Sequence, residues 1–454
     1  MSLHYKDMRR GLAAILCGPL LSIICQPTAS AGQDLQFLSF HPVPLHASGT
    51  GSENPTADSE AAIQQMRPRD AAAREAEYRE AIVALRSTEG PFALPVSERA
   101  LELGRLLQQQ GRFDEALAAY ENSLHVLRVN LGLYSLEQAA VLRAIITAHV
   151  AKRDIANAHA AQEALVNLQL RHHGRSNPAV VPALLEWADW NVNLYLALDP
   201  APDLQMGLHP PGRFHDPRLE LAYDTYTLAL QSLQQHAPAG DEQLVTTERK
   251  LAALNFITNQ KMQDVYGEAL MHYSSIEHDD AGTALESASA TLFYEGSSAL
   301  RRAIAHSERR KERRNDDIAA RMVELGDWYL LFDHRAAALE QYRDALQFMR
   351  DASLPQDAVE RIMSSGMPVP TPDTAYRSAA LAEGQHYDGF IDVEFELSKF
   401  GMATNPHIIG RSAQNRHIER ELMHEIRSCK FRPKFVADSA VNSEKMQLRY
   451  FYSF

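Results

Sequence analysis

The chain has 454 residues, more than a single hydrophobic core usually supports, so two or more structural units are expected. Its 58 Asp and Glu outnumber its 45 Lys and Arg, which gives a formal charge of −13 at pH 7. This acidic balance argues against nucleic acid as a partner, because neutralising phosphates requires clustered cations.

The first 31 residues have the parts of an export signal. The charged start consists of Lys6, Arg9 and Arg10. An apolar run of about 15 residues follows, shorter than the ~20 residues that a membrane-spanning helix needs. Small residues at Ala29 and Ala31 then precede a predicted cleavage site before Gly32. We therefore predict a periplasmic protein, which would associate with the membrane only if this segment were retained.

Changes in composition and periodicity divide the rest of the chain. A stretch rich in Gly, Pro, Ser and Asp is expected to be flexible, and helical periodicity then runs from about Asp70 to Ile362. A segment with three Pro follows and is predicted to be a linker. The expected divisions are a signal peptide at 1–31, a lead-in at 32–70, a helical array at 71–362, a linker at 363–373 and a C-terminal domain at 374–454.

Two stretches of the array, residues 97–128 and 319–350, share five positions at equal distances from a helix glycine. From Gly104 these are Leu107, Gly111, Ala116, Tyr120 and Ser123. From Gly326 they are Tyr329, Asp333, Ala338, Tyr342 and Ala345. Two helices approach closely only where small residues meet, so we expect each glycine to face the alanine twelve positions later. The tyrosine after it would fill the space against the next pair of helices.

This pattern resembles the tetratricopeptide repeat, which implies helical hairpins stacked in a solenoid. Gly132 and Gly174 lie 42 residues apart, a period that resembles the extended repeats of kinesin light chain-type proteins. We expect about four to six hairpins, given a ~34–42-residue period. The array would bind a protein or peptide in its concave groove, for which the candidate residues are Arg105, Gln108 and Asp327.

The C-terminal domain has a different periodicity. Strict alternation from Phe390 to Leu397 predicts a half-buried strand, and residues 403–409 predict a second one, which Pro406 restricts to an edge or bulge. Apolar residues at four-residue spacing predict an amphipathic helix at Asn415–Arg427, and alternation at Met446–Tyr452 predicts the last strand. The fold class is therefore mainly α: a tetratricopeptide-like helical-hairpin solenoid followed by a small α+β domain of order strand-strand-helix-strand.

This order, together with the segment Phe431-Arg432-Pro433 after the helix and an aromatic end, resembles the C-terminal domain of the TonB energy transducers. The resemblance covers about 65 of the 454 residues, and Cys429 stands where that family often has Trp. It implies β-augmentation, in which the last strand pairs with a peptide of an outer-membrane receptor. The side chains that would select the peptide sequence are Gln447, Arg449 and Phe451.

No motif for catalysis is present. The sequence has no Gly-rich phosphate loop, no His-Glu-x-x-His and no Gly-x-Ser-x-Gly elbow, so neither an enzyme nor a cofactor is predicted. His417, Glu421 and His424 share a helical face, as metal ligands can, but a solvated face is the expected reading and no metal is predicted. The basic island Arg309–Arg314 is expected to be a solvated helix start, with anionic lipid or an acidic partner as alternatives.

Two functions remain after this comparison of motifs. The preferred one is a periplasmic interaction scaffold, in which the array binds a protein or peptide and the C-terminal domain adds a contact through its strand edge. The alternative is a TonB-type energy transducer for outer-membrane transport, which requires an uncleaved N-terminal anchor.

Overall fold

The computed structural model describes residues 39–44, 68–197, 216–238, 240–272, 278–371, 388–436 and 438–453. The chain divides into a unit of Phe40–Ser453 and a terminal remainder of Met1–Ser39 with Phe454. The predicted signal peptide lies outside the described residues, as does most of the predicted lead-in. Among the described residues, no helix combines the length and the apolar character needed to span a bilayer.

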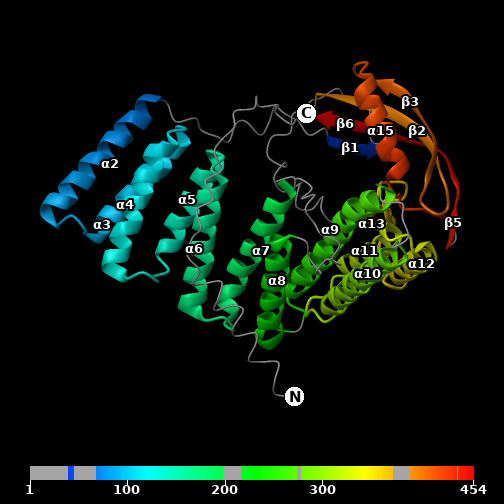
Figure 1. The fold of residues 1–454 in the computed structure, drawn as a ribbon, viewed down its shortest axis with the longest axis horizontal. Helices are drawn as coiled ribbons and strands as arrows, with labels where there is room; N and C mark the ends of the chain where they lie inside the picture. The colour runs from blue at the N-terminus through cyan, green and yellow to red at the C-terminus, as the bar shows by residue number, and fades with distance from the viewer. Residues whose placement is uncertain are drawn as a thin grey trace. The chain divides into compact units, whose positions relative to one another are not determined.

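The array begins with α2 (Pro68–Thr88) and continues as pairs of helices that follow one another along the chain (Figure 1). The pairs are α3 (Leu94–Gln109) with α4 (Phe113–Leu131), α5 (Gln138–Ala151) with α6 (Ile155–His173), α7 (Val181–Ala197) with α8 (Pro217–His236), α9 (Glu242–His272) with α10 (His278–Glu308), and α11 (Asn315–Leu331) with α12 (Arg335–Asp351). A 3-10 turn at Pro178–Val180 precedes α7, and α13 (Gln356–Met363) ends the array. From α2 to α12 each helix packs against the next, and α13 packs against α11, so the described residues contain five hairpins and the predicted solenoid is confirmed.

The close approach inside a hairpin is made between a glycine and a tyrosine ring. A Cβ built on Gly104 would lie 2.3 Å from Cε1 of Tyr120, and one on Gly326 would lie 2.6 Å from Cε1 of Tyr342. Both rings are fully buried. The expectation that each glycine faces an alanine is therefore corrected. The alanine is buried in the same hairpin, but the ring one turn beyond it lies over the glycine.

The C-terminal domain follows the predicted order. It contains β2 (Gly389–Leu397), β3 (Ala403–Arg411), α15 (Arg416–Ser428) and β6 (Ser443–Ser453), with β2 antiparallel to both β3 and β6. The alternation is also confirmed, because the buried residues of β2 include Ile391, Val393, Phe395 and Leu397. A small hairpin that the sequence did not predict, β4 (Lys434–Val436) and β5 (Ser439–Val441), lies between α15 and β6.

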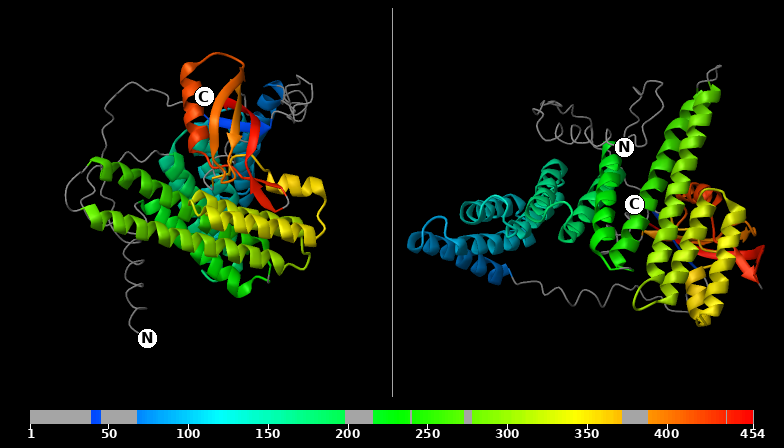
Figure 2. Two further views of the ribbon diagram at one scale, coloured as in Figure 1. Left: turned by 90° about the vertical axis from the view of Figure 1, so that its right-hand side faces the viewer. Right: turned by 90° about the horizontal axis from the view of Figure 1, so that it is seen from below.

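A further strand, β1 (Ser39–Pro44), comes from the segment predicted to be a flexible lead-in. The order of the sheet is β1-β6-β2-β3, so β6 is hydrogen-bonded to a neighbour on each side. In Figures 1 and 2 the blue strand β1 accordingly lies beside the red strand β6. The prediction that the last strand presents a free edge is therefore wrong. A segment some 400 residues earlier in the chain already pairs with it. A pattern that is local in the sequence does not reveal a pairing over so large a separation.

The described part of the Pro-rich segment predicted to be a linker is hydrogen-bonded to the C-terminal domain. Val369 N donates to Lys430 O at 2.8 Å, and Gly366 N donates to Arg432 O at 2.9 Å. Pro368 and Phe431 form an isolated antiparallel bridge. Prolines break helices but leave extended backbone able to pair through its other amides and carbonyls. Residues 363–371 therefore join the last hairpin to the C-terminal domain by backbone hydrogen bonds.

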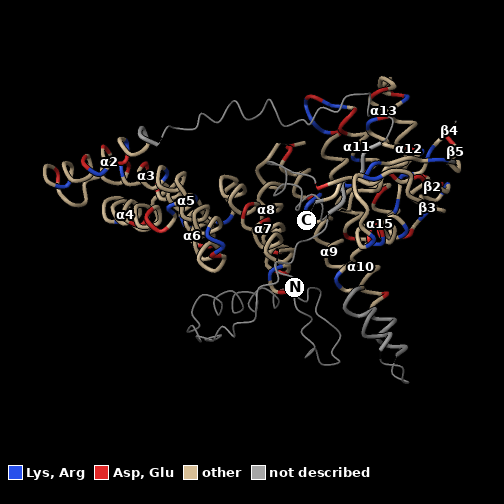
Figure 3. The backbone as a smooth tube through the Cα atoms, turned by 90° about the horizontal axis from the view of Figure 1, so that it is seen from above, with Lys and Arg blue, Asp and Glu red and all other residues tan. Residues whose placement is uncertain are grey.

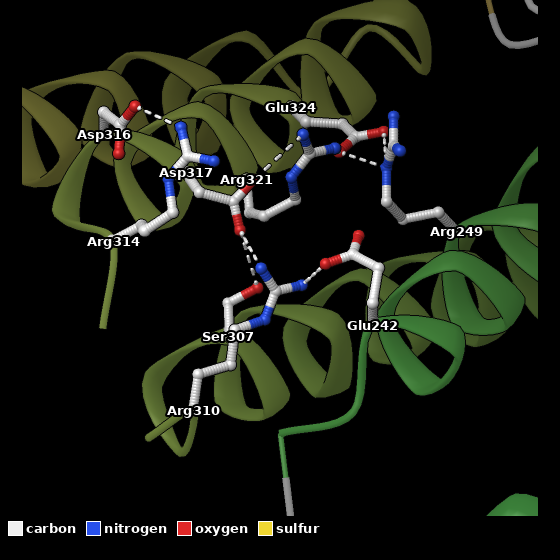
Figure 4. A network of polar contacts seen from close by, with 9 residues as sticks. All are labelled: Glu242, Arg249, Ser307, Arg310, Arg314, Asp316, Asp317, Arg321 and Glu324. Carbon is white, nitrogen blue, oxygen red and sulfur yellow. Dashed lines mark hydrogen bonds and ion pairs between the residues drawn. The ribbon is translucent and has the colours of Figure 1, made fainter. Parts of the chain in front are cut away.

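Two residues of the basic island Arg309–Arg314, Arg310 and Arg314, take part in an ion-pair network (Figure 4). Arg310, in the turn after α10, pairs with Glu242 of α9 and lies 3.2 Å from Asp317 of α11. The network also includes Arg249, Ser307, Arg314, Asp316, Arg321 and Glu324. The expectation of a solvated helix start is confirmed for Arg309 and residues 311–314, which are exposed, but not for Arg310, whose side chain is only 17% exposed. These pairs connect three consecutive helices of the array.

Candidate functional site

A groove with a volume of about 840 Å³ opens between α3 and α5, the first helices of two consecutive hairpins. The start of α4 and the turn before α5 complete its walls. The lining residues are Arg105, Gln108, Gln109, Phe113, Tyr120, Leu136, Glu137, Ala139, Ala140, Arg143, Ala144 and Thr147. The α5 wall is mostly small residues, which leaves room beside the long polar side chains of α3.

Two arginines give the groove its cationic groups. Arg105 Nη1 lies 2.7 Å from Glu102 Oε1, and Arg143 Nη2 lies 2.9 Å from Glu186 Oε2. Both guanidinium side chains are about half exposed, at 49% and 52%. Exposed pairs of this kind contribute only about 0–1 kcal/mol, so a carboxylate arriving in the groove can compete for either arginine. Elsewhere in the described array, cationic and acidic residues are interspersed along the helices (Figure 3).

A tyrosine from α4, the second helix of the hairpin, lies at the floor of the groove. Tyr120 Oη donates to Gln108 Oε1 at 2.8 Å. Burial raises the pKa of Tyr120 to about 12, partly opposed by the Arg105 cation. The hydroxyl is therefore protonated at neutral pH and acts as a donor. This bond engages Gln108 Oε1, so the NH₂ group of the Gln108 amide remains to donate a hydrogen bond to a ligand.

The same kind of contact recurs in other hairpins. Tyr226 of α8 bonds Asp189 of α7, and Tyr342 of α12 donates to Asp327 of α11 at 2.7 Å. In each case a tyrosine on the second helix reaches a polar side chain on the first. In the α3–α4 hairpin, which lines the groove, the acceptor of the tyrosine hydrogen bond is the neutral amide of Gln108. The carboxylates in the other two hairpins are already paired with cations of the chain, Lys250 and Arg432.

The structure separates the three predicted groove residues. Arg105 and Gln108 line the groove, but Asp327 is only 5% exposed and does not. Asp327 receives two hydrogen bonds from Arg432, at 2.9 and 2.6 Å, in addition to the one from Tyr342. Its position beside a helix glycine was read correctly as part of a hairpin. However, the C-terminal domain covers that end of the hairpin, so Asp327 belongs to an internal contact.

The predicted strand residues Gln447, Arg449 and Phe451 all lie on β6, but β2 already engages them. Arg449 Nε and Nη2 bond Asp392 at 2.8 and 3.0 Å, and its guanidinium lies 4.0 Å from the centre of the Phe390 ring. Gln447 donates to Glu394 at 2.8 Å. These side chains lie on the face of β6 opposite the buried Leu448, Tyr450 and Tyr452, as predicted, and their selection of a peptide stays a prediction. Cross-strand partners on β2 hold the polar heads of Gln447 and Arg449.

Sequence reasoning missed the α5 wall of the groove. Arg143 and Thr147 were not among the predicted site residues, although the 42-residue period gave a signal for one of them. That period places Thr147 at the position that Arg105 occupies one repeat earlier. Following it from one hairpin to the next would have identified α5 as the second wall.

A titratable group in the C-terminal domain gives a testable pH dependence. Burial raises the pKa of Glu425, on α15, from 4.5 to about 7. Burial, with the Glu425 charge, also raises the pKa of the Cys429 thiol to about 11. A carboxyl whose folded pKa lies above its unfolded pKa stabilises the fold while it is neutral. Its contribution is complete below pH 4.5 and is lost as the pH rises through about 7.

We therefore expect the stability of the C-terminal domain to fall between about pH 5 and pH 8, and the Glu425→Gln variant to fall less. Urea unfolding at several pH values measures both curves. Glu421→Gln is the matched control, since Glu421 lies on the same helix with its side chain 53% exposed. Parallel curves for wild type and Glu425→Gln would show that Glu425 is not the group responsible.

The comparisons with known proteins concern the fold. No protein-family model matches the chain, and no curated protein matches it. Among solved structures it is similar to BtubC (BKLC) from P. vanneervenii, with 13% identity, 70% of this chain and 92% of that chain covered, and a TM-score of 0.35. It is also similar to a Podosopora anserina putative kinesin light chain with nearly identical TPR-like repeats, with 14% identity, 57% and 97% coverage, and a TM-score of 0.36.

Proposed function

We propose that this chain is an exported interaction scaffold whose groove between α3 and α5 binds an extended, acidic segment of a protein partner. The observation that carries the proposal is the groove itself, which spans two consecutive hairpins and presents Arg105 and Arg143 half exposed. Helical-hairpin solenoids present such surfaces because each repeat contacts only its neighbours and the loops and first helices remain accessible. No catalytic step is part of this function.

The charges of the groove favour an acidic ligand. Arg105 and Arg143 lie on opposite walls, and Glu137 is the one acidic residue in the lining. An extended segment lying along the groove would place its carboxylates between the two guanidinium groups. The backbone of that segment would meet the donating NH₂ group of Gln108 and the amide of Gln109, which both donates and accepts. A basic segment would instead face two cations at close range.

Fluorescence anisotropy with three labelled ten-residue peptides, one acidic, one neutral and one basic, tests this proposal on the full chain. We expect the acidic peptide to bind best. The double variant Arg105→Ala/Arg143→Ala should weaken its binding by about five- to thirtyfold, since each exposed pair contributes up to ~1 kcal/mol. Arg99→Ala is the control, because Arg99 is exposed on α3 but does not line the groove. Equal binding by wild type and the double variant would contradict the proposal.

Export to the periplasm is the second part of the proposal, and it is supported by the sequence of residues 1–31 alone. N-terminal sequencing of the mature protein tests it. A chain that starts at Gly32 fits a periplasmic scaffold. A chain that starts at Met1 in the membrane fraction would instead favour the TonB-type transducer, which requires the anchor.

The C-terminal domain supports a strand-edge contact with a partner, in the manner of the TonB resemblance. The support comes from the order strand-strand-helix-strand and the segment Phe431-Arg432-Pro433 after α15. An outer-membrane receptor is the partner that the resemblance implies. Because β1 lies along β6, any such contact has to be made in competition with this strand.

A further inference from the structure

The outer side of β6 is occupied by a strand of the chain's own N-terminal segment. β6 pairs with β2 over a register that runs from Gly389 opposite Tyr452 to Leu397 opposite Ser443. On its other side it is hydrogen-bonded to β1. β1 thus forms one edge of the sheet, and its removal would expose the backbone amides and carbonyls of β6.

β1 is a weaker neighbour of β6 than β2 is. It has six residues, against nine in β2, and two of the six are Pro42 and Pro44. Proline has no amide hydrogen, so these two positions cannot donate to the ladder, and proline in a sheet is tolerated at an edge for this reason. A strand of six residues forms fewer ladder hydrogen bonds than the nine-residue β2, so it can be exchanged for another strand at a lower cost.

The chemistry of this edge favours an uncharged strand. The sequence of β1, Ser-Phe-His-Pro-Val-Pro, contains no Asp, Glu, Lys or Arg. The charged head of Arg449 on β6 is already paired with Asp392, and Gln447 is bonded to Glu394. Recognition along the edge therefore depends mainly on the backbone, which pairs with any extended segment that can follow the strand.

We propose that β1 is an internal ligand that closes a strand-accepting edge on β6, and that an extended, uncharged segment of a partner protein binds by displacing it. This inference rests on the strand-edge contact proposed above and names the segment that regulates it. A tethered strand competes at an effective concentration in the millimolar range, so the internal occupant lowers the apparent affinity of the edge for an external strand. The groove between α3 and α5 is not involved.

The test uses the full chain and a synthetic peptide with the sequence of residues 37–46. In one variant a Gly-Ser repeat of equal length replaces residues 39–44, and in the matched control it replaces residues 51–56. We expect the β6 amides that point toward β1 to exchange hydrogen at least tenfold faster in the first variant than in wild type or control. The peptide should bind that variant at least tenfold more tightly than wild type and restore its protection.

Two single substitutions keep the proposal testable if the longer replacement disturbs folding. Successive amides of a strand point to opposite sides, so only one of Phe40 and His41 donates toward β6. One of Phe40→Pro and His41→Pro should therefore loosen β1, and the other should not. Protection of the β2 amides verifies that each variant is folded.

The outcomes separate this inference from the proposed function. Unchanged exchange of β6 in every variant, or peptide binding no tighter than in wild type, would overturn the internal-ligand inference while leaving acidic-peptide binding in the groove untouched. If β1 is displaceable but the groove does not bind the acidic peptide, the proposed function is contradicted and the internal-ligand inference stands. Size-exclusion chromatography distinguishes a partner strand from exchange of β1 between two copies, since a dimer that forms without added peptide would contradict the proposed occupant.

Discussion

Asp327→Ala is expected to destabilise the last hairpin together with the C-terminal domain by about 3–5 kcal/mol, the usual cost of removing one partner from a buried ion pair. The substitution would leave the Arg432 guanidinium, only 13% exposed, without its two hydrogen bonds to the carboxylate. It would also remove the acceptor of the buried Tyr342 hydroxyl. Burial raises the pKa of that hydroxyl well above 10, so it stays a donor with no acceptor. Urea unfolding monitored by tryptophan fluorescence, to which Trp328 beside Asp327 contributes, measures the loss.

Two further variants show whether burial causes the loss. Arg350 and Asp438 also join α12 to the C-terminal domain, but their side chains are 48% and 50% exposed. Arg350→Ala should therefore cost only about 0–1 kcal/mol. Replacing both buried partners, as in Asp327→Leu/Arg432→Met, should recover much of the stability, because no charge is left unpaired. If Asp327→Ala unfolds at the same urea concentration as Arg350→Ala, the buried pair does not hold the two parts together.

Gly104→Leu is expected to disrupt the first hairpin. Even a Cβ at this position would lie 2.3 Å from the ring of Tyr120, which is itself completely buried and hydrogen-bonded to Gln108. The ring cannot move away without breaking that bond, so the helices must separate. Overpacking typically costs about 1–3 kcal/mol, and the lost hydrogen bond adds about 1 kcal/mol. Hydrogen exchange of the α3 and α4 amides measures the effect locally, which suits an array whose repeats can unfold separately.

The control for this prediction is Ala72→Leu, at an exposed position of α2 where a larger side chain meets solvent. It should leave the exchange rates of α3 and α4 unchanged. A second variant, Gly104→Ala/Tyr120→Leu, removes the ring and should restore part of the protection lost in Gly104→Ala. Wild-type exchange in Gly104→Leu would mean that α3 and α4 do not pack through this contact.

The helices and their pairing follow from patterns that are local in sequence. Gly104 and Tyr120 lie sixteen residues apart, within one hairpin, and the same spacing at Gly326 and Tyr342 identified the second unit. The alternation in β2 and the apolar spacing in α15 are local in the same way, because burial on one face imposes a fixed period. The groove was predicted on one side only, since Arg105 and Gln108 belong to α3 while Arg143 and Thr147 come from the next hairpin.

The sequence by itself determined the repeat, the helical hairpins and the order of β2, β3, α15 and β6, since each depends on side chains at most about forty residues apart. Only the tertiary structure decided the contacts between distant segments. It paired β1 with β6, placed Asp327 against Arg432 and engaged Arg449 with Asp392. The physical reason is that the backbone groups of an edge strand and a buried carboxylate each need a partner, and many segments carry suitable groups. Which segment supplies the partner is set by how the folded chain brings remote residues together, and no periodicity records that choice.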